Sequence, residues 1–299
     1  MGVAALPRAL SLVSSAGRPR VVVYFGNAPG DDLLCTPVLE ALAASGQSPV
    51  WMLTRHPDLF TGNPSVARVL PYDEPLAYAL ALMGVRRLRL RFLHFFPDQD
   101  RAGPPAEHVI HVMARRAGLD PAAVLLAPRL YLDAAEREFG RFGDRQIAIH
   151  STALSAGMPI GNKEWYPERF QRVIDAMSGE ATFVQLGLAT DPPLHDVVDL
   201  RGKTTLRQAA AAVANSRAFV GLAGFLMHLA KAVGTKSVIV YGGREHPSQT
   251  GYADNVNLYT AMPCAPCWFW NRCDYGRECM DRIAADDVVA AVRTVLGST

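Results

Sequence analysis

No apolar run in this sequence of 299 residues approaches the roughly 18 to 20 residues that a helix needs to span a bilayer. The sequence also has almost no net charge, because 30 basic side chains are matched by 28 acidic ones and leave +2. Such a chain has no overall field to attract a nucleic acid or an anionic membrane. These two absences exclude an integral membrane protein and disfavour a nucleic-acid partner.

Clear signals for secretion or lipidation are absent as well. The opening apolar stretch is short, Pro7 and Arg8 interrupt it, and the strand-like "VVVYFG" follows at once. Gly2 follows the first methionine, yet Leu6 occupies the position where a myristoylation signal has Ser or Thr. We therefore expect a cytoplasmic protein.

The composition and the order of the apolar runs predict two α/β domains. A chain of this length exceeds what one core holds efficiently, and its 49% hydrophobic content supplies apolar material for two. Runs such as "RVVVYFG", "PVWMLT", "RQIAIHS", "TFVQLG" and "KSVIVYGG" alternate with helical segments, which is typical of parallel sheets flanked by helices. The polar, glycine-punctuated "AAEREFGRFGDR" separates the two sets. We predict domains over residues 1–143 and 144–299.

Apolar residues recur at helical spacing in two segments, and we predict that both stripes face the core. The stripes consist of Leu34, Val38, Leu39 and Leu42 in the first half, and of Phe170, Val173, Ile174 and Met177 in the second. Cys35 is expected in the core of the first half.

Two adjacent aspartates form the first candidate site. The stretch "YFGNAPGDDLLCTP" leaves the first predicted strand and enters a helix at about Asp31 or Asp32. An aspartate there can cap the helix, because its carboxylate accepts backbone N–H bonds and favours the positive end of the helix dipole. Two of them allow one to cap while the other acts as a general base. Their spacing alone leaves open which does which.

A second candidate site lies in "VGLAGFLMHLAKAVGTKSVIVYGG", where Gly221 and Gly224 precede a predicted helix that contains His228. Glycines at such a turn let a phosphate approach the backbone, and the helix N-terminus supplies partial positive charge. The pattern favours a diphosphate site, with a turn that needs glycine for steric reasons as the alternative. It is not a dinucleotide fingerprint, because G-x-G-x-x-G is absent.

The segment "HSTALSAGMPIGNKEWYPERF" is long and irregular before its helix begins near Pro167, and long loops at strand ends tend to be functional. Lys163 in this loop either meets a phosphate as a point charge or is a solvated surface lysine. His228 by itself is more typical of a hydrogen-bonded helical histidine than of a ligand contact.

Four of the five cysteines lie within 16 residues, in the pattern C-x2-C-x5-C-x5-C formed by Cys264, Cys267, Cys273 and Cys279. The opening C-x2-C is typical of tetrahedral thiolate metal sites. Disulfides are improbable in a cytosolic chain, and four packed thiols are the remaining alternative. Zinc and iron both accept four thiolates, and such a site would be closed to substrate and structural.

Together these residues resemble the glycosyltransferase family 9 heptosyltransferases. "GDDLLCTPVLEAL" resembles the family's G-D-x-x-x-x-x-P stretch, "NPSVARVLPYD" its N-P-x-V segment and "NKEWYPERFQRVI" its K-x-W-P stretch. "DLRGKTTLRQAAAAVANSRAFVG" resembles the segment before the diphosphate loop, and "HLAKAVG" matches well. The cysteine cluster is similar to that of a cysteine-bearing branch with iron-containing members, which favours iron over zinc.

The resemblance implies a GT-B fold, in which two Rossmann-like domains face each other across a cleft. It implies an inverting transfer with Asp31 as general base and a nucleotide-diphosphate sugar as donor, with ADP-heptose favoured. We expect the backbone around Gly224 and Phe225, assisted by His228 and Lys163, to stabilise the leaving diphosphate, so that no catalytic Mg²⁺ is required. The donor-binding candidates are Ser151, Lys163, Gly187, Gly221, Gly224, Phe225, His228 and Gly243.

The sequence departs from the family pattern at two places. The family usually has D-S-G or D-T-G in the diphosphate loop, where this chain has Leu222, Ala223 and Gly224. Phosphate binding must then rely on backbone N–H groups and basic neighbours. The family's ribose-binding glutamate has no clear counterpart after Gly187, where residues 188–191 read "LATD".

The acceptor is left open among lipopolysaccharide core, a protein hydroxyl and a natural product such as an aminocyclitol from antibiotic biosynthesis. A cationic acceptor could meet a polar stretch, itself otherwise a solvated loop, that contains His94, Asp98, Asp100, Glu107, His108 and His111. A sugar-nucleotide epimerase of the same architecture and a non-catalytic nucleotide-sugar-binding protein are the alternative functions.

Overall fold

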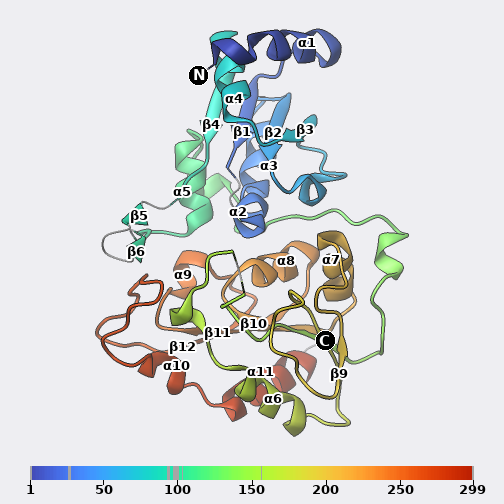
Figure 1. The fold of residues 1–299 in the computed structure, drawn as a ribbon, viewed down its shortest axis with the longest axis vertical. Coiled ribbons are helices and arrows are strands. Elements are labelled where there is room, and N and C mark those ends of the chain that lie inside the picture. The colour runs from blue at the N-terminus through green and yellow to red at the C-terminus, as the bar shows by residue number, and fades with distance from the viewer. Residues whose placement is uncertain are drawn as a thin grey trace. The chain divides into compact units, whose positions relative to one another are not determined.

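The computed structural model describes residues 2–25, 28–92, 104–155 and 157–297, and the backbone alone of 95–96 and 101–102. The chain forms two compact units, which are drawn in Figure 1. Unit 1 consists of Met1–Phe92 and Val109–Tyr131, and unit 2 of Leu93–His108 and Leu132–Thr299.

Unit 1 contains a four-stranded parallel sheet in the order β3-β2-β1-β4. Its strands are β1 (Val21–Tyr24), β2 (Val50–Thr54), β3 (Arg68–Pro71) and β4 (Arg86–Arg89). Its α-helices are α1 (Leu6–Ala16), α2 (Pro29–Leu34), α3 (Thr36–Ala44), α4 (Glu74–Leu82) and α5 (Val109–Arg116). Every residue of β1 and β2 is buried, as expected for parallel strands covered on both faces.

The opening residues are part of the core of unit 1. Ala9 of α1 is fully buried and packs in the same apolar cluster as Leu76 and Leu80 of α4 and Trp51 of β2. Because α1 covers apolar surface of this core, the first segment of the chain acts as a structural helix of the unit.

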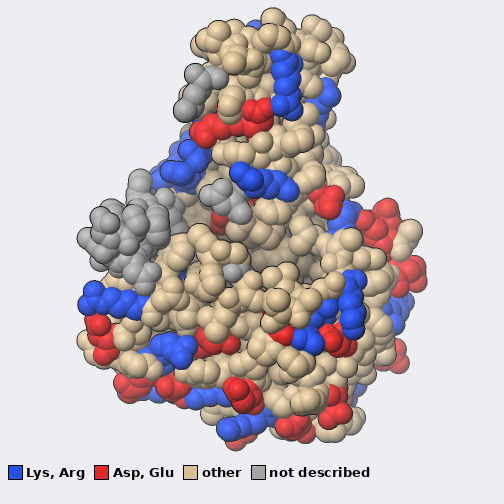
Figure 2. All heavy atoms as spheres, viewed as in Figure 1, with Lys and Arg blue, Asp and Glu red and all other residues tan. Residues whose placement is uncertain are grey.

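Unit 2 contains a six-stranded parallel sheet in the order β12-β11-β10-β7-β8-β9. Its strands are β7 (Gln146–Ile149), β8 (Thr182–Gln185), β9 (Val197–Asp199), β10 (Ala218–Leu222), β11 (Ser237–Gly242) and β12 (Val256–Tyr259). Its α-helices are α6 (Pro167–Ala176), α7 (Leu206–Ala214), α8 (Phe225–Val233), α9 (Pro247–Thr250), α10 (Glu278–Asp281) and α11 (Ala285–Gly297). The antiparallel pair β5 (Phe95–Phe96) and β6 (Arg101–Ala102) belongs to the same unit. Side chains of both charges are interspersed over the face of unit 2 in Figure 2.

The prediction of parallel α/β architecture is confirmed, with three differences in detail. The helix after β1 begins at Pro29 and therefore before the aspartates, and strand β12 adds an edge that the sequence did not indicate. The two units divide after Tyr131, whereas the predicted domain boundary lies at residues 143 and 144. An ion pair between Glu136 and Arg207 of α7 holds the intervening segment on unit 2.

Both predicted apolar stripes are buried, although the first is split between α2 and α3 at Cys35. Cys35 is fully buried, and burial raises the pKa of its thiol. Within the described part of the chain, no helix is both long and apolar enough to cross a membrane.

Phe170 tests the packing of the second stripe. Its ring meets Trp165 edge-on, with centroids 4.8 Å apart, and both side chains are fully buried. We expect Phe170→Ala to lower the free energy of unfolding by about 3–5 kcal/mol, because it removes buried surface and leaves a cavity. Arg172→Ala, on the exposed side of α6, is the control. Equal urea midpoints for the two variants would contradict a stripe that stabilises the fold.

Candidate active site

Four of the eight predicted donor contacts follow the carboxyl ends of the strands of unit 2. Ser151 follows β7, Gly187 follows β8, Gly224 follows β10 and Gly243 follows β11. Because all four strands are parallel, these loops emerge at one edge of the sheet, where α/β folds bind ligands. This edge is therefore the candidate site.

The N-terminus of α8 is open at this edge. Gly224 is its N-cap residue, and no side chain caps the helix. Gly224 has extended backbone, with φ 169°, and nothing lies within 4 Å of where a Cβ would be. The glycine is thus not required by a tight turn, while the first-turn N–H groups and the helix dipole favour an anion beside Phe225.

Lys163 lies beside this helix terminus. Its ammonium nitrogen donates to the carbonyl oxygen of Ala223 at 3.0 Å and lies 2.5 Å from Oε1 of Glu245. Only 14% of the lysine side chain is exposed. The interpretation of Lys163 as a solvated surface lysine is therefore wrong. Its positive charge is held at the loop formed by residues 222–224.

Glu245 is a buried carboxylate between two cations. It pairs with Lys163 and Arg244, and Oε2 accepts a hydrogen bond from Thr250 at 2.9 Å. Burial favours the protonated carboxyl, but the charges of Lys163 and Arg244 outweigh it and hold the pKa of Glu245 at about 2. The three side chains carry a net charge of +1 next to α8. The sequence analysis did not single out Glu245; its signal was a charged pair directly after a buried strand.

His228 is buried on α8, where its Nδ1 lies 2.6 Å from the hydroxyl of Tyr252. Burial lowers the pKa of His228 to about 3, so the ring is neutral near pH 7. The expectation of a hydrogen-bonded helical histidine holds. His228 can therefore assist a diphosphate only as a neutral hydrogen-bond donor.

Three other predicted donor contacts are engaged with neighbouring residues of the protein itself. A Cβ on Gly221 would lie 2.6 Å from the ring of Phe219, so this glycine serves packing within β10. Gly243 lets the cysteine segment approach, because a Cβ there would lie 3.0 Å from Cβ of Cys279. Ser151 is fully buried, and its Oγ accepts a hydrogen bond from Gln185 at 3.4 Å.

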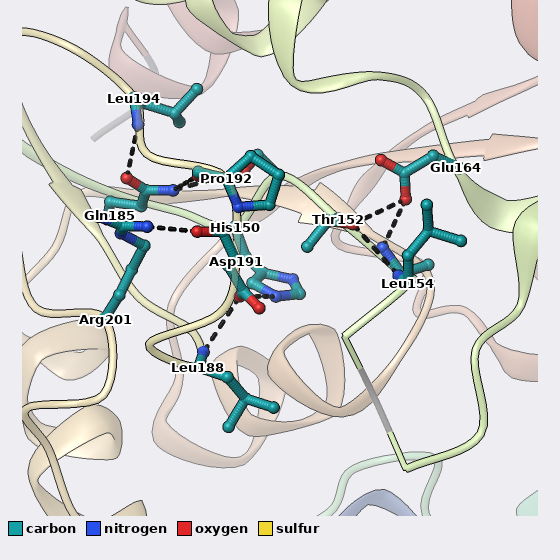
Figure 3. A network of polar contacts seen from close by, with 12 residues as sticks. His150, Thr152, Leu154, Glu164, Gln185, Leu188, Asp191, Pro192, Leu194 and Arg201 are labelled. Atoms are coloured by element: carbon teal, nitrogen blue, oxygen red, sulfur yellow. Dashed lines mark hydrogen bonds and ion pairs between the residues drawn. The ribbon is translucent and has the colours of Figure 1, made fainter.

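A second carboxylate that sequence reasoning missed is Asp191, which Figure 3 shows beside His150 and Leu188. Its Oδ2 lies 3.2 Å from Nε2 of His150 and accepts the backbone N–H of Leu188. Burial alone would raise the pKa of Asp191, but hydrogen bonds from His150 and Ser155 lower it below its usual value. Gly187, at φ 140°, is required here, because a Cβ would lie 2.0 Å from Oδ2.

The loop that carries Lys163 is fixed by the cysteine segment, residues 264–279. The side-chain nitrogen of Asn162 donates to the carbonyl oxygens of Phe269 at 3.2 Å and Arg272 at 2.7 Å. Arg277 donates to the carbonyl oxygen of Gly161 at 2.9 Å. Arg244 stacks on Trp268 and donates to the carbonyl oxygen of Phe269. The cysteine segment thus contacts Gly161 and Asn162, which precede Lys163 in the chain. It also contacts Arg244, which pairs with the carboxylate of Glu245.

The four cysteines of this segment are free, half-buried thiols. Cys267, Cys273 and Cys279 each accept a backbone N–H bond. Burial, and then the charges of neighbouring cysteines, raise the pKa of Cys267 and Cys279, although the charge of Arg244 opposes this at Cys267. Among the described residues, no three metal-binding side chains are close enough to hold an ion. The donor chemistry nevertheless fits a soft metal.

In unit 1 the two aspartates differ in their surroundings. The N-cap residue of α2 is Ala28, so neither Asp31 nor Asp32 is the N-cap that the sequence allowed. Asp32 is fully buried and accepts hydrogen bonds from Thr54 at 2.5 Å and His56 at 2.8 Å. Asp31 is half-buried on the same helix.

Two further regions bear on binding. A cavity of 880 Å³ in unit 2 lies between α6 and residues 190–195, and none of the predicted donor contacts line it.

In the polar stretch proposed to meet a cationic acceptor, His94, Asp98 and Asp100 lie outside the described residues. His108 is buried, with Nε2 3.1 Å from the carbonyl oxygen of Gly251.

Residues 129–273 match the glycosyltransferase family 9 (heptosyltransferase) family, and the resemblance read from the sequence is confirmed. No curated protein matches the chain.

Three solved structures show the same fold. A family 9 glycosyltransferase from Veillonella parvula DSM 2008 is 16% identical over 94% of this chain and 98% of its own, with a TM-score of 0.70. The iron-containing dodecameric glycosyltransferase TibC of enterotoxigenic E. coli H10407 is 17% identical over 94% and 77%, with a TM-score of 0.72. ADP-heptose lipopolysaccharide heptosyltransferase II of E. coli is 15% identical over 93% and 98%, with a TM-score of 0.68. The predicted GT-B architecture of two Rossmann-like domains is confirmed.

Glu245→Gln tests the buried ion cluster. Because the folded pKa of Glu245 lies below its usual 4.5, its contribution is fully present above pH 4.5 and is lost as the pH falls towards 2. The shift corresponds to roughly 3 kcal/mol. We expect Glu245→Gln to destabilise the protein at pH 7, with the difference shrinking below pH 4.5 in urea titrations.

The control is Glu180→Gln, which removes an exposed pair with Arg293 and should change stability little at any pH. If the stability difference between Glu245→Gln and wild type did not change with pH, the ion pairing of Glu245 with Lys163 and Arg244 would be contradicted.

Proposed function

We propose that the protein is an inverting glycosyltransferase that uses a nucleotide-diphosphate sugar, starting from the match of residues 129–273 to glycosyltransferase family 9. Unit 2 binds the donor and unit 1 the acceptor. The observation that carries the proposal is the uncapped N-terminus of α8 with the ammonium of Lys163 beside it. This combination is suited to a diphosphate without the acidic and hydroxyl residues that the family usually has in its loop.

The donor we favour is ADP-heptose. TibC has been solved in complex with ADP-D-β-D-heptose, and a second structural neighbour is an ADP-heptose heptosyltransferase. The family description is also that of heptosyltransferases. These likenesses support a heptosyl donor for this chain.

Charge that develops on the leaving diphosphate is stabilised by fixed groups in unit 2. The backbone N–H groups around Gly224 and Phe225 point from a helix N-terminus, and Lys163 contributes a positive charge held by Glu245. His228 adds a neutral hydrogen bond. With these donors the reaction needs no catalytic Mg²⁺.

Asp31 is the proposed general base. A hydroxyl oxygen of the acceptor attacks the anomeric carbon, its proton passes to the Asp31 carboxylate, and the bond from that carbon to the diphosphate oxygen breaks. The nucleoside diphosphate leaves and the anomeric configuration inverts. Asp31 fits the role better than Asp32, whose carboxylate is buried and engaged with Thr54 and His56.

The acceptor is a hydroxyl compound, and the charge of unit 1 favours one that is not cationic. Residues 1–92 and 109–131 contain 12 arginines, no lysine and 7 acidic residues, which leaves 12 − 7 = +5. A positive surface repels an amine-bearing molecule and attracts an anionic one. A lipopolysaccharide core or a protein hydroxyl therefore fits better than an aminocyclitol.

The four cysteines would hold iron, with zinc as the alternative. The support is the thiolate donor set, the N–H bonds to three sulfur atoms, and the iron in the structural neighbour TibC. When bound, the metal would act as a structural cross-link of the cysteine segment. A cytoplasmic location, where thiols stay reduced, fits this donor set.

Asp31→Asn tests the catalytic assignment. General-base help contributes about 10²- to 10⁴-fold, so we expect turnover of ADP-heptose with acceptor to fall by that order while donor affinity is retained. Product formation by mass spectrometry and ADP binding by calorimetry measure the two effects. Unchanged turnover would remove Asp31 from the mechanism, and donor turnover without any acceptor would favour an epimerase.

Elemental analysis tests the metal assignment. We expect about one iron or zinc ion per purified chain, lost in Cys267→Ser together with a drop in thermal stability, since the ion stabilises the fold. Cys35→Ser, in the core of unit 1, is the control and should keep the ion. A metal-free wild-type protein of normal stability would contradict a structural site.

A further inference from the structure

The Asp32–His56 pair in unit 1 is a buried polar arrangement that the proposed mechanism does not use. Asp32 is fully buried, and both its hydrogen-bond donors reach the same oxygen, Oδ2. The other oxygen, Oδ1, is buried without a hydrogen-bond partner among the described residues. A buried carboxylate with one unpartnered oxygen costs stability, so packing alone does not account for an aspartate at this position.

The pair fixes the orientation and the tautomer of the His56 ring. The backbone N–H of His56 donates to Oγ1 of Thr54 at 2.8 Å, and Thr54 in turn donates to Oδ2 of Asp32. A carboxylate only accepts hydrogen bonds, so Nδ1 of His56 carries the proton that Oδ2 receives at 2.8 Å. In the neutral ring the lone pair then lies on Nε2.

Nε2 is available to a ligand. The side chain of His56 is 20% exposed, while that of Asp32 is inaccessible, so the carboxylate supports the ring from the buried side. Within the described part of the chain, Nε2 has no hydrogen-bond partner. The ring therefore presents one oriented hydrogen-bond acceptor to solvent.

His56 lies at the edge of the sheet where the proposed base is found. Strands β1 and β2 are parallel neighbours, with Tyr24 opposite Leu53, and α2 follows β1 while His56 follows β2. Asp31 and the Asp32 that holds His56 are consecutive residues of α2. Asp31 and the loop that presents Nε2 therefore lie at the same edge of the unit 1 sheet.

We propose that His56 is an acceptor-binding residue, whose Nε2 accepts a hydrogen bond from a hydroxyl of the acceptor, and that Asp32 is its positioning residue. The inference rests on the proposed function, because it gives unit 1 the acceptor. This hydrogen bond favours acceptors with a second hydroxyl near the reacting one, as in a sugar diol. Asp31 remains the group that receives the proton.

The test is a kinetic comparison of His56→Ala, His56→Gln and Asp32→Asn in the full chain, with ADP-heptose and a lipopolysaccharide-core oligosaccharide as probes. We expect His56→Ala to raise the acceptor KM by about tenfold, with donor KM unchanged and the turnover rate within a few fold of wild type. His56→Gln should recover part of the loss, because its amide can donate to Asp32 and accept from a hydroxyl. His195→Ala, an exposed histidine of unit 2, is the control and should leave the acceptor KM unchanged.

Asp32→Asn separates binding from proton transfer. Asparagine keeps an oxygen for Thr54 and His56 and removes the unpartnered charge, so we expect normal folding and an acceptor KM within a few fold of wild type. If turnover in Asp32→Asn fell by the roughly 100-fold or more that general-base help is worth, at unchanged acceptor KM, the proposal would be overturned and His56 would be a base. Unchanged kinetics in His56→Ala would also overturn it and leave the pair as a brace between α2 and the loop after β2.

Nitrogen-15 shifts of the histidine rings test the geometry without any acceptor. The His56 signals, assigned by their absence in His56→Gln, should show Nδ1 protonated and Nε2 unprotonated in the neutral ring. A proton on Nε2 overturns the inference. If the wild-type protein transfers no sugar to the oligosaccharide, the proposed acceptor is wrong, and the tautomer still decides whether the ring presents a lone pair.

Discussion

The proposed donor site depends on one buried carboxylate. Glu245 lies between Lys163 and Arg244, and all three charges are largely removed from water. A buried ion that loses its partner is strongly destabilising, so each of the three side chains constrains the positions of the other two. The ammonium beside α8 is therefore placed by electrostatics within unit 2 and not by the reach of a flexible lysine. A preorganised charge of this kind loses little on binding an anion.

The same constraint connects the cysteine segment with the candidate diphosphate site. Arg244 and Asn162 both donate to backbone carbonyls of residues between Cys267 and Cys273. Backbone carbonyls of an irregular segment keep their positions only while that segment keeps its conformation. Whatever fixes the four cysteines consequently also fixes the loop that carries Lys163. A group that never touches substrate can influence transfer in this way, because small displacements of a charged contact reduce the rate strongly.

The sequence predicted what depends on local pattern. The strands follow from apolar runs, and the stripe of α6 follows from its spacing, so Phe170 and Val173 are buried as expected. Contacts between distant segments were predicted less well. Glu245 is 82 residues from Lys163, and no local sequence pattern indicates that they pair. The glycines show the same limit, because Gly221 and Gly224 are equivalent in the sequence. Only the structure shows that Phe219 crowds the first while space is open beside the second.

Burial also separates the two aspartates that the sequence could not tell apart. Consecutive helix residues point about 100° apart, so a helix that packs on the sheet turns one of them inward and the other away. Asp32 is the inward one, and burial raises the pKa of its carboxyl in spite of the hydrogen bonds from Thr54 and His56. Both aspartates lie in the first turn of α2, so the helix dipole does not distinguish them, and Asp31 differs in being only half-buried. Two identical side chains thus acquire different surroundings, and on this difference rest the proposed roles of Asp31 as proton acceptor and of Asp32 as positioning residue.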